Sequence, residues 1–349
     1  MTPRPTPTRS TRAARRPLAG ARTLAVGSLA GALVLAGCGT QDALVGLRPA
    51  PAEQTAAAPL DVDGATAVAA RLLTAADAPA EGDAKAAAAA RTAVLRGDAL
   101  TVANARAASK ATPEVASSGL AAVARPTVVA QSQGRDWPRA ILATTLDEKT
   151  NTHVLHVMLS EAPAEPFRIT ASVPMFAGAT LPALGDGAKG APLLDIAAKN
   201  DLASAPKDAV AAYAGALATP KPKATEVVAL DDPFATALRT SATAQTKALG
   251  KLASLTQVHQ PVLDEAVTFR LAGGGAVTFG LMRRTDTVSL NAAAKEVVLP
   301  AEYAKVTGRR TATTSFTLSN LEPFVMVVPT TGPAQVIGAT ELLTSGKAR

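Results

Sequence analysis

Residues 139–173 read RAILATTLDEKTNTHVLHVMLSEAPAEPFRITASV, and this stretch decides the fold class. Valine, isoleucine and threonine gather in three segments of it, and charged or proline-containing breaks separate the segments. Such composition and spacing are typical of antiparallel strands joined by short turns. We therefore predict strands over 139–145, 152–159 and 167–173, preceded by another over 127–131.

Two helices are expected before this sheet. Asp63 and Asp83 each precede an alanine-rich segment with apolar residues at helical spacing. Because an aspartate side chain accepts hydrogen bonds from the N–H groups of a first turn, each is expected to cap a helix, one through about residue 76 and one over 84–108. Gly97 lies inside the second segment and is expected to kink or divide that helix.

The same order of elements occurs again further along the chain. Helices are expected over 206–217 and from Asp231-Asp232-Pro233 to about Leu255. The strands expected after them cover 258–263, 266–271, 276–283, 312–319, 323–328 and 334–342, with a hairpin turn at Ala272-Gly273-Gly274-Gly275.

Helices followed by antiparallel strands predict an α+β fold. The expected organisation is two helix-helix-sheet units, 62–180 and 206–345, joined by a linker over 181–205. Each unit resembles the nuclear-transport-factor-2-like, or cystatin-like, cone. One continuous α+β domain with a large sheet is the alternative.

The N-terminal segment has the order of a bacterial signal peptide. Residues 1–37 carry six arginines and no acid, and their last part is a thirteen-residue apolar run over 24–36. A membrane-spanning helix needs about 20 such residues, so this run is expected to belong to a cleaved leader. Arg15-Arg16 leaves twin-arginine export open beside the general route.

Cys38 closes this leader and is the only cysteine of the chain. Leu35, Ala36 and Gly37 precede it, and together the four residues resemble the lipobox of bacterial lipoproteins, whose cysteine takes a diacylglycerol. The resemblance implies acyl chains on Cys38, and two or more such chains attach a protein stably to a membrane. Residues 38–61 are then a lipidated N-terminus and tether. An ordinary secreted protein is the alternative.

The net charge argues against a nucleic-acid partner. The six arginines of the leader account for all but one unit of the formal charge of +7. A mature domain near neutrality has no electrostatic footprint for a phosphate backbone. The predicted partners are therefore membrane lipid, through acylated Cys38, and an envelope protein or a small ligand.

Four further segments carry a resemblance to a family. They are DWPR at 136–139, FAGATLP at 176–182, DDPF at 231–234 and QVIGA at 335–339. With them the chain resembles uncharacterised actinobacterial lipoproteins that carry a domain of unknown function. The resemblance implies export, lipidation and a domain without an assigned activity, and it supplies no catalytic residues.

Residues able to do chemistry are few and scattered. His153 and His156 are three apart on an expected strand, where side chains alternate, so they are not expected to grip one metal ion. The GDGAKG sequence at 185–190 lies among Gly and Pro breaks, unlike a dinucleotide-binding turn. The acid pairs Asp147-Glu148 and Asp264-Glu265 are expected in solvated turns or strands, and Asp231-Asp232 at a helix cap. No metal, cofactor or catalytic residue is predicted.

A ligand pocket is the remaining possibility for a site. Its candidate residues are Trp137, Arg139, His153, His156 and Arg283, the last beside Arg284 at an expected strand end. The predicted function is a lipid-anchored, extracytoplasmic, non-enzymatic binding or envelope-assembly protein at the cell membrane. A ligand carrier or enzyme with a cone-shaped pocket is the alternative, and a concavity with converging ionisable groups would favour it.

Overall fold

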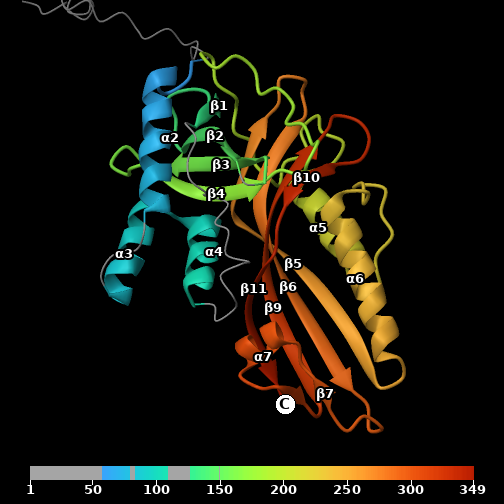
Figure 1. Cartoon of the computed structure of the whole chain (residues 1–349). Coiled ribbons are helices and arrows are strands. Elements are labelled where there is room, and N and C mark those ends of the chain that lie inside the picture. Colours follow the sequence, from blue (N-terminus) through green and yellow to red (C-terminus); the bar gives the residue numbers. More distant parts are fainter. Residues whose placement is uncertain (1–56, 79–82, 109–125, 149) are drawn as a thin grey trace, which may run out of the picture. The chain divides into compact units, whose positions relative to one another are not determined.

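The computed structural model describes residues 57–78, 83–108, 126–148 and 150–349 (Figure 1). All of them fall within one compact unit, Glu53–Arg349. The predicted leader, Cys38 and most of the predicted tether lie outside the described residues. Helices and antiparallel sheets make up the unit, so the predicted α+β class is confirmed. None of the described helices is long and apolar enough to span a bilayer.

Helix α2 (Val62–Asp77) begins two residues earlier than the sequence suggests. Its N-cap is Asp61, whose Oδ1 accepts a hydrogen bond from the Gly64 N–H at 2.6 Å. The expected cap at Asp63 is wrong, because that residue already lies in the first helical turn. There its negative charge still favours the positive end of the helix.

The second predicted helix is divided, as the glycine inside it indicates. Helix α3 (Ala84–Val94) is capped by Asp83, and α4 (Gly97–Ala108) follows. Gly97 has a φ of +48°, which L side chains rarely adopt. A Cβ there would also lie 2.8 Å from side-chain oxygens of Glu265 and Thr170. A close approach to two strands therefore fixes where α4 begins.

The first sheet follows the predicted strands closely. Its strands pair antiparallel in chain order, and they are β1 (Thr127–Gln131), β2 (Arg139–Asp147), β3 (Thr152–Ser160) and β4 (Arg168–Pro174). One face packs on α2 through a cluster that includes Leu72, Leu73, Ile141 and Met158. Both faces are covered, which explains why β3 is buried over most of its length.

Two helices lead into the second sheet. Helix α5 (Pro206–Ala216) matches the prediction, and α6 (Pro233–Leu249) has the expected cap at Asp232. The expected end near Leu255 is wrong, because the helix stops before Gly250, which has a φ of +55°. The residues that follow turn back into a long strand.

The second sheet has the order β10-β9-β6-β5, with β11 also paired to β9. Its strands are β5 (Ala253–Arg270), β6 (Ala276–Leu290), β9 (Ser315–Val328), β10 (Gln335–Ala339) and β11 (Leu342–Ala348). Between β6 and β9 the chain forms the small pair β7 (Val297–Val298) and β8 (Thr311–Ala312) and helix α7 (Ala301–Thr307), none of which was predicted as an element of its own.

Two pairs of predicted strands are single long strands in the structure. Strand β5 runs through a register irregularity between Val262 and Val267, where two strands were expected. Strand β9 contains Pro323, which was expected to begin a new strand. At that point β10 ends opposite Phe324 and β11 begins opposite Leu321, so the proline interrupts no continuous ladder on that side.

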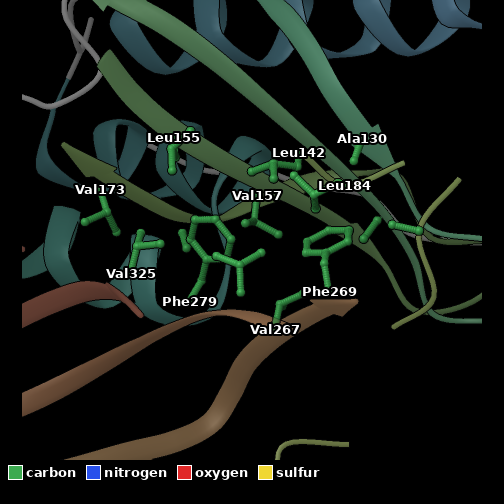
Figure 2. Packing of buried hydrophobic residues seen from close by; sticks show 14 of the residues in the cluster. Ala130, Leu142, Leu155, Val157, Val173, Leu184, Val267, Phe269, Phe279 and Val325 are labelled. Carbon is green, nitrogen blue, oxygen red and sulfur yellow. The ribbon is translucent and has the colours of Figure 1, made fainter. Parts of the chain in front are cut away.

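The two sheets share a core (Figure 2). Leu142, Leu155 and Val157 of the first sheet pack in one cluster with Phe269 and Phe279 of the second. The two phenylalanine rings meet edge to face, with centroids 6.5 Å apart. Residues expected in a linker also belong to this cluster, namely Leu184 and Ala191. Residues from both predicted units therefore stabilise one another, while the cone resemblance stays a prediction.

Candidate functional site

Besides the Tyr213–Asp232 pair at the cap of α6, buried ionisable groups gather at two places in the described part of the chain. One is a cavity beside α4, which we call the α4 cavity. The other lies on β5, β6 and β9, and we call it the β-sheet network; it comprises His259, Arg284, Asp286, Asn320 and Glu322. The two differ in how completely their charges are paired.

The α4 cavity has a volume of about 360 Å³. Helix α4 supplies one wall, with Asp98, Val102 and Arg106 at the three- to four-residue spacing of a single helical face. Strands β3 and β4 and the segment after β4 supply another wall, through Val154 and Phe176 among others. The helix contacts β4 and β11, and residues of β6 and β9 complete the lining.

Most of the cavity wall is apolar, formed by side chains such as Val102, Val154, Met175, Phe176 and Pro323. A few polar side chains interrupt it. This combination of an apolar wall and a small number of converging polar groups is typical of small-molecule sites. The converging groups therefore decide what the cavity can bind.

Asp98 is one of these groups and lies in the first turn of α4. It is only 5% exposed. Burial raises the pKa of its carboxyl to about 7, and the negative charges of Glu265 and Asp264 add to the effect. Near neutral pH this side chain therefore exchanges between a neutral hydrogen-bond donor and a buried anion.

Arg106 is the second group, two turns further along the same face. Its Nε is buried and has no hydrogen-bond partner within the described residues. Burial lowers the pKa of the guanidinium, and no carboxylate of the described ranges pairs with it. A guanidinium Nε that is cut off from water and meets no acceptor among the described residues is costly, because nothing replaces the lost hydration of that atom.

Arg96 holds the start of α4 in place. Its Nη2 lies 2.6 Å from Glu161 Oε1 and 3.0 Å from Glu265 Oε2. One arginine thus joins the residue after β3 to the β5 strand, directly before the helix. Glu265 of the predicted acid pair is therefore engaged in an ion pair, where it also contributes to the raised pKa of Asp98.

The β-sheet network depends on strand register. His259 of β5 and Asn320 of β9 both lie opposite Arg284 of β6, so all three point to one face of the sheet. Arg284 Nη1 donates to Glu322 Oε1 at 2.9 Å, and Arg284 Nε donates to Asp286 Oδ2 at 3.1 Å. Neighbouring strands thus supply partners for every charge.

Further contacts complete the network. His259 Nδ1 lies 2.8 Å from Glu322 Oε2, and Asn320 donates to Asp286 Oδ2 at 3.2 Å. Glu341, between β10 and β11, adds a third carboxylate 2.7 Å from Arg284 Nη1. Burial acts to lower the pKa of Arg284, but these carboxylates together raise it above its ordinary value.

A carboxylate that orients an imidazole is also the arrangement of a general base. His259 Nε2 is free of hydrogen bonds within the described residues, but its side chain is completely buried, and so is that of Glu322. A substrate has no path to that nitrogen in this structure. The network is therefore suited to holding three strands together rather than to catalysis.

The structure brings two of the predicted ligand residues together. The Arg139 guanidinium carbon lies 4.3 Å from the centroid of the Trp137 ring, which is a cation–π contact. Neither residue lines the α4 cavity. His153 is exposed near the other end of β3, opposite Leu146, about 20 Å away along the sheet.

His156 has a structural environment. It is fully buried, with Nε2 2.9 Å from Thr145 Oγ1 and Nδ1 2.9 Å from Ser172 Oγ. Burial lowers the pKa of this imidazole to about 3. Neutral His156 therefore bridges β2 and β4 across β3.

Arg283 is exposed on β6, whereas its neighbour Arg284 is the buried residue at the centre of the network. Alternation along the strand separates them, and sequence reasoning chose the exposed one as a ligand candidate. It did not single out Asp98 or Arg106 either. Their spacing on one face of an expected helix was the available signal. No described cluster of His, Cys, Asp or Glu side chains is arranged to hold a metal ion.

Comparison with known proteins identifies no relative of this chain, since no protein-family model, curated protein or solved structure matches it. The lipoprotein-family resemblance stays a prediction. The function of the chain is therefore inferred from the geometry of the α4 cavity.

Proposed function

We propose that this chain is a lipid-anchored, extracytoplasmic binding protein that holds a small ligand in the α4 cavity. The observation that carries the proposal is the convergence of Asp98 and Arg106 on a mainly apolar cavity of about 360 Å³. Ligand sites commonly combine these features. A concave site of this kind favours the binding of a small ligand, whereas a protein partner is more often bound by a flat surface.

The groups at the cavity favour binding over catalysis. Ser172 lines it and is hydrogen-bonded to His156, a pair that could suggest an activated nucleophile. The pKa of that imidazole is lowered to about 3, so it is a weak base at neutral pH. The serine is therefore a polar contact for a ligand in this proposal.

The anchoring part of the proposal is supported by the leader and the lipobox-like Leu35-Ala36-Gly37-Cys38. Labelling with an alkyne analogue of palmitate and membrane fractionation test it. We expect label and membrane attachment in the unaltered chain and neither in Cys38→Ala. An unlabelled chain, or a Cys38→Ala variant that stays on membranes, would contradict the anchor.

The cavity part is tested with a neutral apolar probe, decan-1-ol, by isothermal titration calorimetry. The full chain carrying Cys38→Ser avoids acyl chains and detergent. We expect saturable binding of one molecule, weakened at least about tenfold by Val102→Trp, which fills the cavity. Val258→Trp is the matched control, because Val258 is an exposed valine on β5. Absent binding, or equal loss in both variants, would contradict the proposed site.

A further inference from the structure

We infer that the ligand is a small amphipathic monocarboxylate, whose acid group pairs with Arg106 and whose apolar chain lies along α4. This inference rests on the proposed function and names the chemical class that the α4 cavity selects.

The pairing of arginines singles out Arg106. Arg96 and Arg284, the arginines buried most completely, each contact at least two carboxylates. Arg106 has a buried Nε and no anionic partner in the described part of the chain. A guanidinium presents its donors as a planar fork that fits a carboxylate with two parallel hydrogen bonds. A carboxylate would supply the partner that the described residues do not give Arg106.

The balance of charge limits the ligand to at most one negative charge, because the carboxylates of Asp98 and Asp147 line the cavity beside a single cation. Arg106 is the only arginine or lysine among the described residues that line the cavity. Asp98 lies eight residues earlier on α4, about 12 Å away along the helix axis, and so does not neutralise it. A phosphate monoester carries close to two negative charges at neutral pH and would bring one that nothing here offsets.

The size and wall of the cavity describe the rest of the ligand. About 360 Å³ holds roughly twelve non-hydrogen groups at about 30 Å³ each. That is the size of a ten-carbon carboxylate. Val102, Ala103, Met175 and Phe176 offer apolar contacts for such a chain. A purely polar acid would leave this surface without partners.

Matched probes separate the ligand classes. Decanoate, decan-1-ol and decylammonium share a chain and differ in head-group charge. They are titrated at pH 6, where Asp98 is mostly neutral, into the full chain carrying Cys38→Ser. We expect decanoate to bind at least about tenfold more tightly than decan-1-ol, and decylammonium to bind most weakly.

Substitution of Arg106 tests the contact itself. Arg106→Leu should weaken decanoate about 10- to 100-fold and leave decan-1-ol within about threefold. Arg106→Lys should keep part of the preference for the anion. This variant replaces Arg106→Leu in the test if the leucine variant does not fold. Arg239→Leu, which removes an exposed arginine of α6 that does not line the cavity, is the control and should change neither probe.

The outcomes are distinguishable. Decan-1-ol binding without tighter decanoate binding, or decanoate binding that Arg106→Leu leaves unchanged, would overturn the carboxylate inference while the proposed function stands. Failure of all three probes to bind would overturn the proposed function. Tighter decanoate binding that Arg106→Leu abolishes, with the Arg239→Leu control unaffected, supports both.

Discussion

Arg284 and Arg106 are both largely withdrawn from water, yet their surroundings differ. Arg284 lies on a strand between two others and contacts the carboxylates of Asp286, Glu322 and Glu341. Arg106 lies on a helix face that borders a cavity, and the described residues give it no carboxylate. A charge that the fold itself pairs contributes to structure. A charge that the described residues leave unpaired supports the proposal of a partner from outside.

The difference has a geometric origin. Strand register places side chains of β5, β6 and β9 directly opposite one another, so each charge of the network meets a neighbour from the same sheet. The face of α4 that carries Asp98 and Arg106 lies against a space instead. Burial is therefore offset by ion pairs at one site, whereas at the other the described residues supply no such pair.

The largest expected effect is a difference in stability between two variants, each of which lacks one of these arginines. Arg284→Leu leaves buried carboxylates without their cation and should lower the free energy of unfolding by about 3 to 5 kcal/mol. Arg106→Leu removes an unpaired charge and should leave that free energy unchanged or raise it by up to about 1 kcal/mol. Urea unfolding followed by circular dichroism measures both.

A similar loss in the two variants would break the comparison, because it would mean that Arg106 is paired in solution. Glu341→Gln is the matched control for the network. Its side chain is about half exposed, so its loss should cost less than about 1 kcal/mol.

His156 provides a second test of a fully partnered group, this time through pH. Its folded-state pKa is lowered to about 3 by burial, while an unfolded histidine titrates near 6.5. Between these values only the unfolded chain takes up the proton, so stability is complete above pH 6.5 and falls as pH drops toward 3. We expect a loss of about 4 kcal/mol from this group by pH 3.5.

Unfolding measured from pH 7 to pH 3.5 shows whether this occurs. His156→Gln cannot be protonated and should flatten the acid limb, although it begins from a lower stability. An imidazole that titrates near 6.5 in the folded chain, seen by NMR, would contradict the prediction.

Asp98 should show the opposite dependence with a smaller effect. Its folded-state pKa is raised to about 7 from an ordinary 3.8, so stability is complete below pH 3.8 and is lost as pH rises toward 7. At pH 8 the structure therefore holds a buried, ionised carboxylate. Asp98→Asn should raise the free energy of unfolding by about 2 kcal/mol at pH 8, and by much less at pH 4.

Thermal or urea unfolding at the two pH values measures this difference. Asp208→Asn, at an exposed aspartate in the first turn of α5, is the control and should show no such pH dependence. An Asp98→Asn variant that is less stable at pH 8 would mean that the carboxylate has a cationic partner, and the α4 cavity would then resemble the network.

Several features of the fold could be predicted because they depend on neighbouring residues. Strands β1 to β4 match their expected ranges closely, since charged and proline breaks separate short β-rich segments. Asp83 and Asp232 cap helices as expected, because a cap involves atoms within one turn. The merging of predicted strands into β9 could not be predicted. Pro323 is tolerated there because β10 ends and β11 begins beside it, and this depends on residues distant in the sequence.

The sequence by itself determined the α+β class, the order of most elements and the helix caps at Asp83 and Asp232. The tertiary structure decided which charges are paired. Arg283 and Arg284 are adjacent and chemically identical in the sequence, and only register with His259 and Asn320 makes one of them the centre of a network. Burial and pairing depend on segments far apart in the chain, and for that reason only the folded protein showed that the described residues give Arg106 no carboxylate partner.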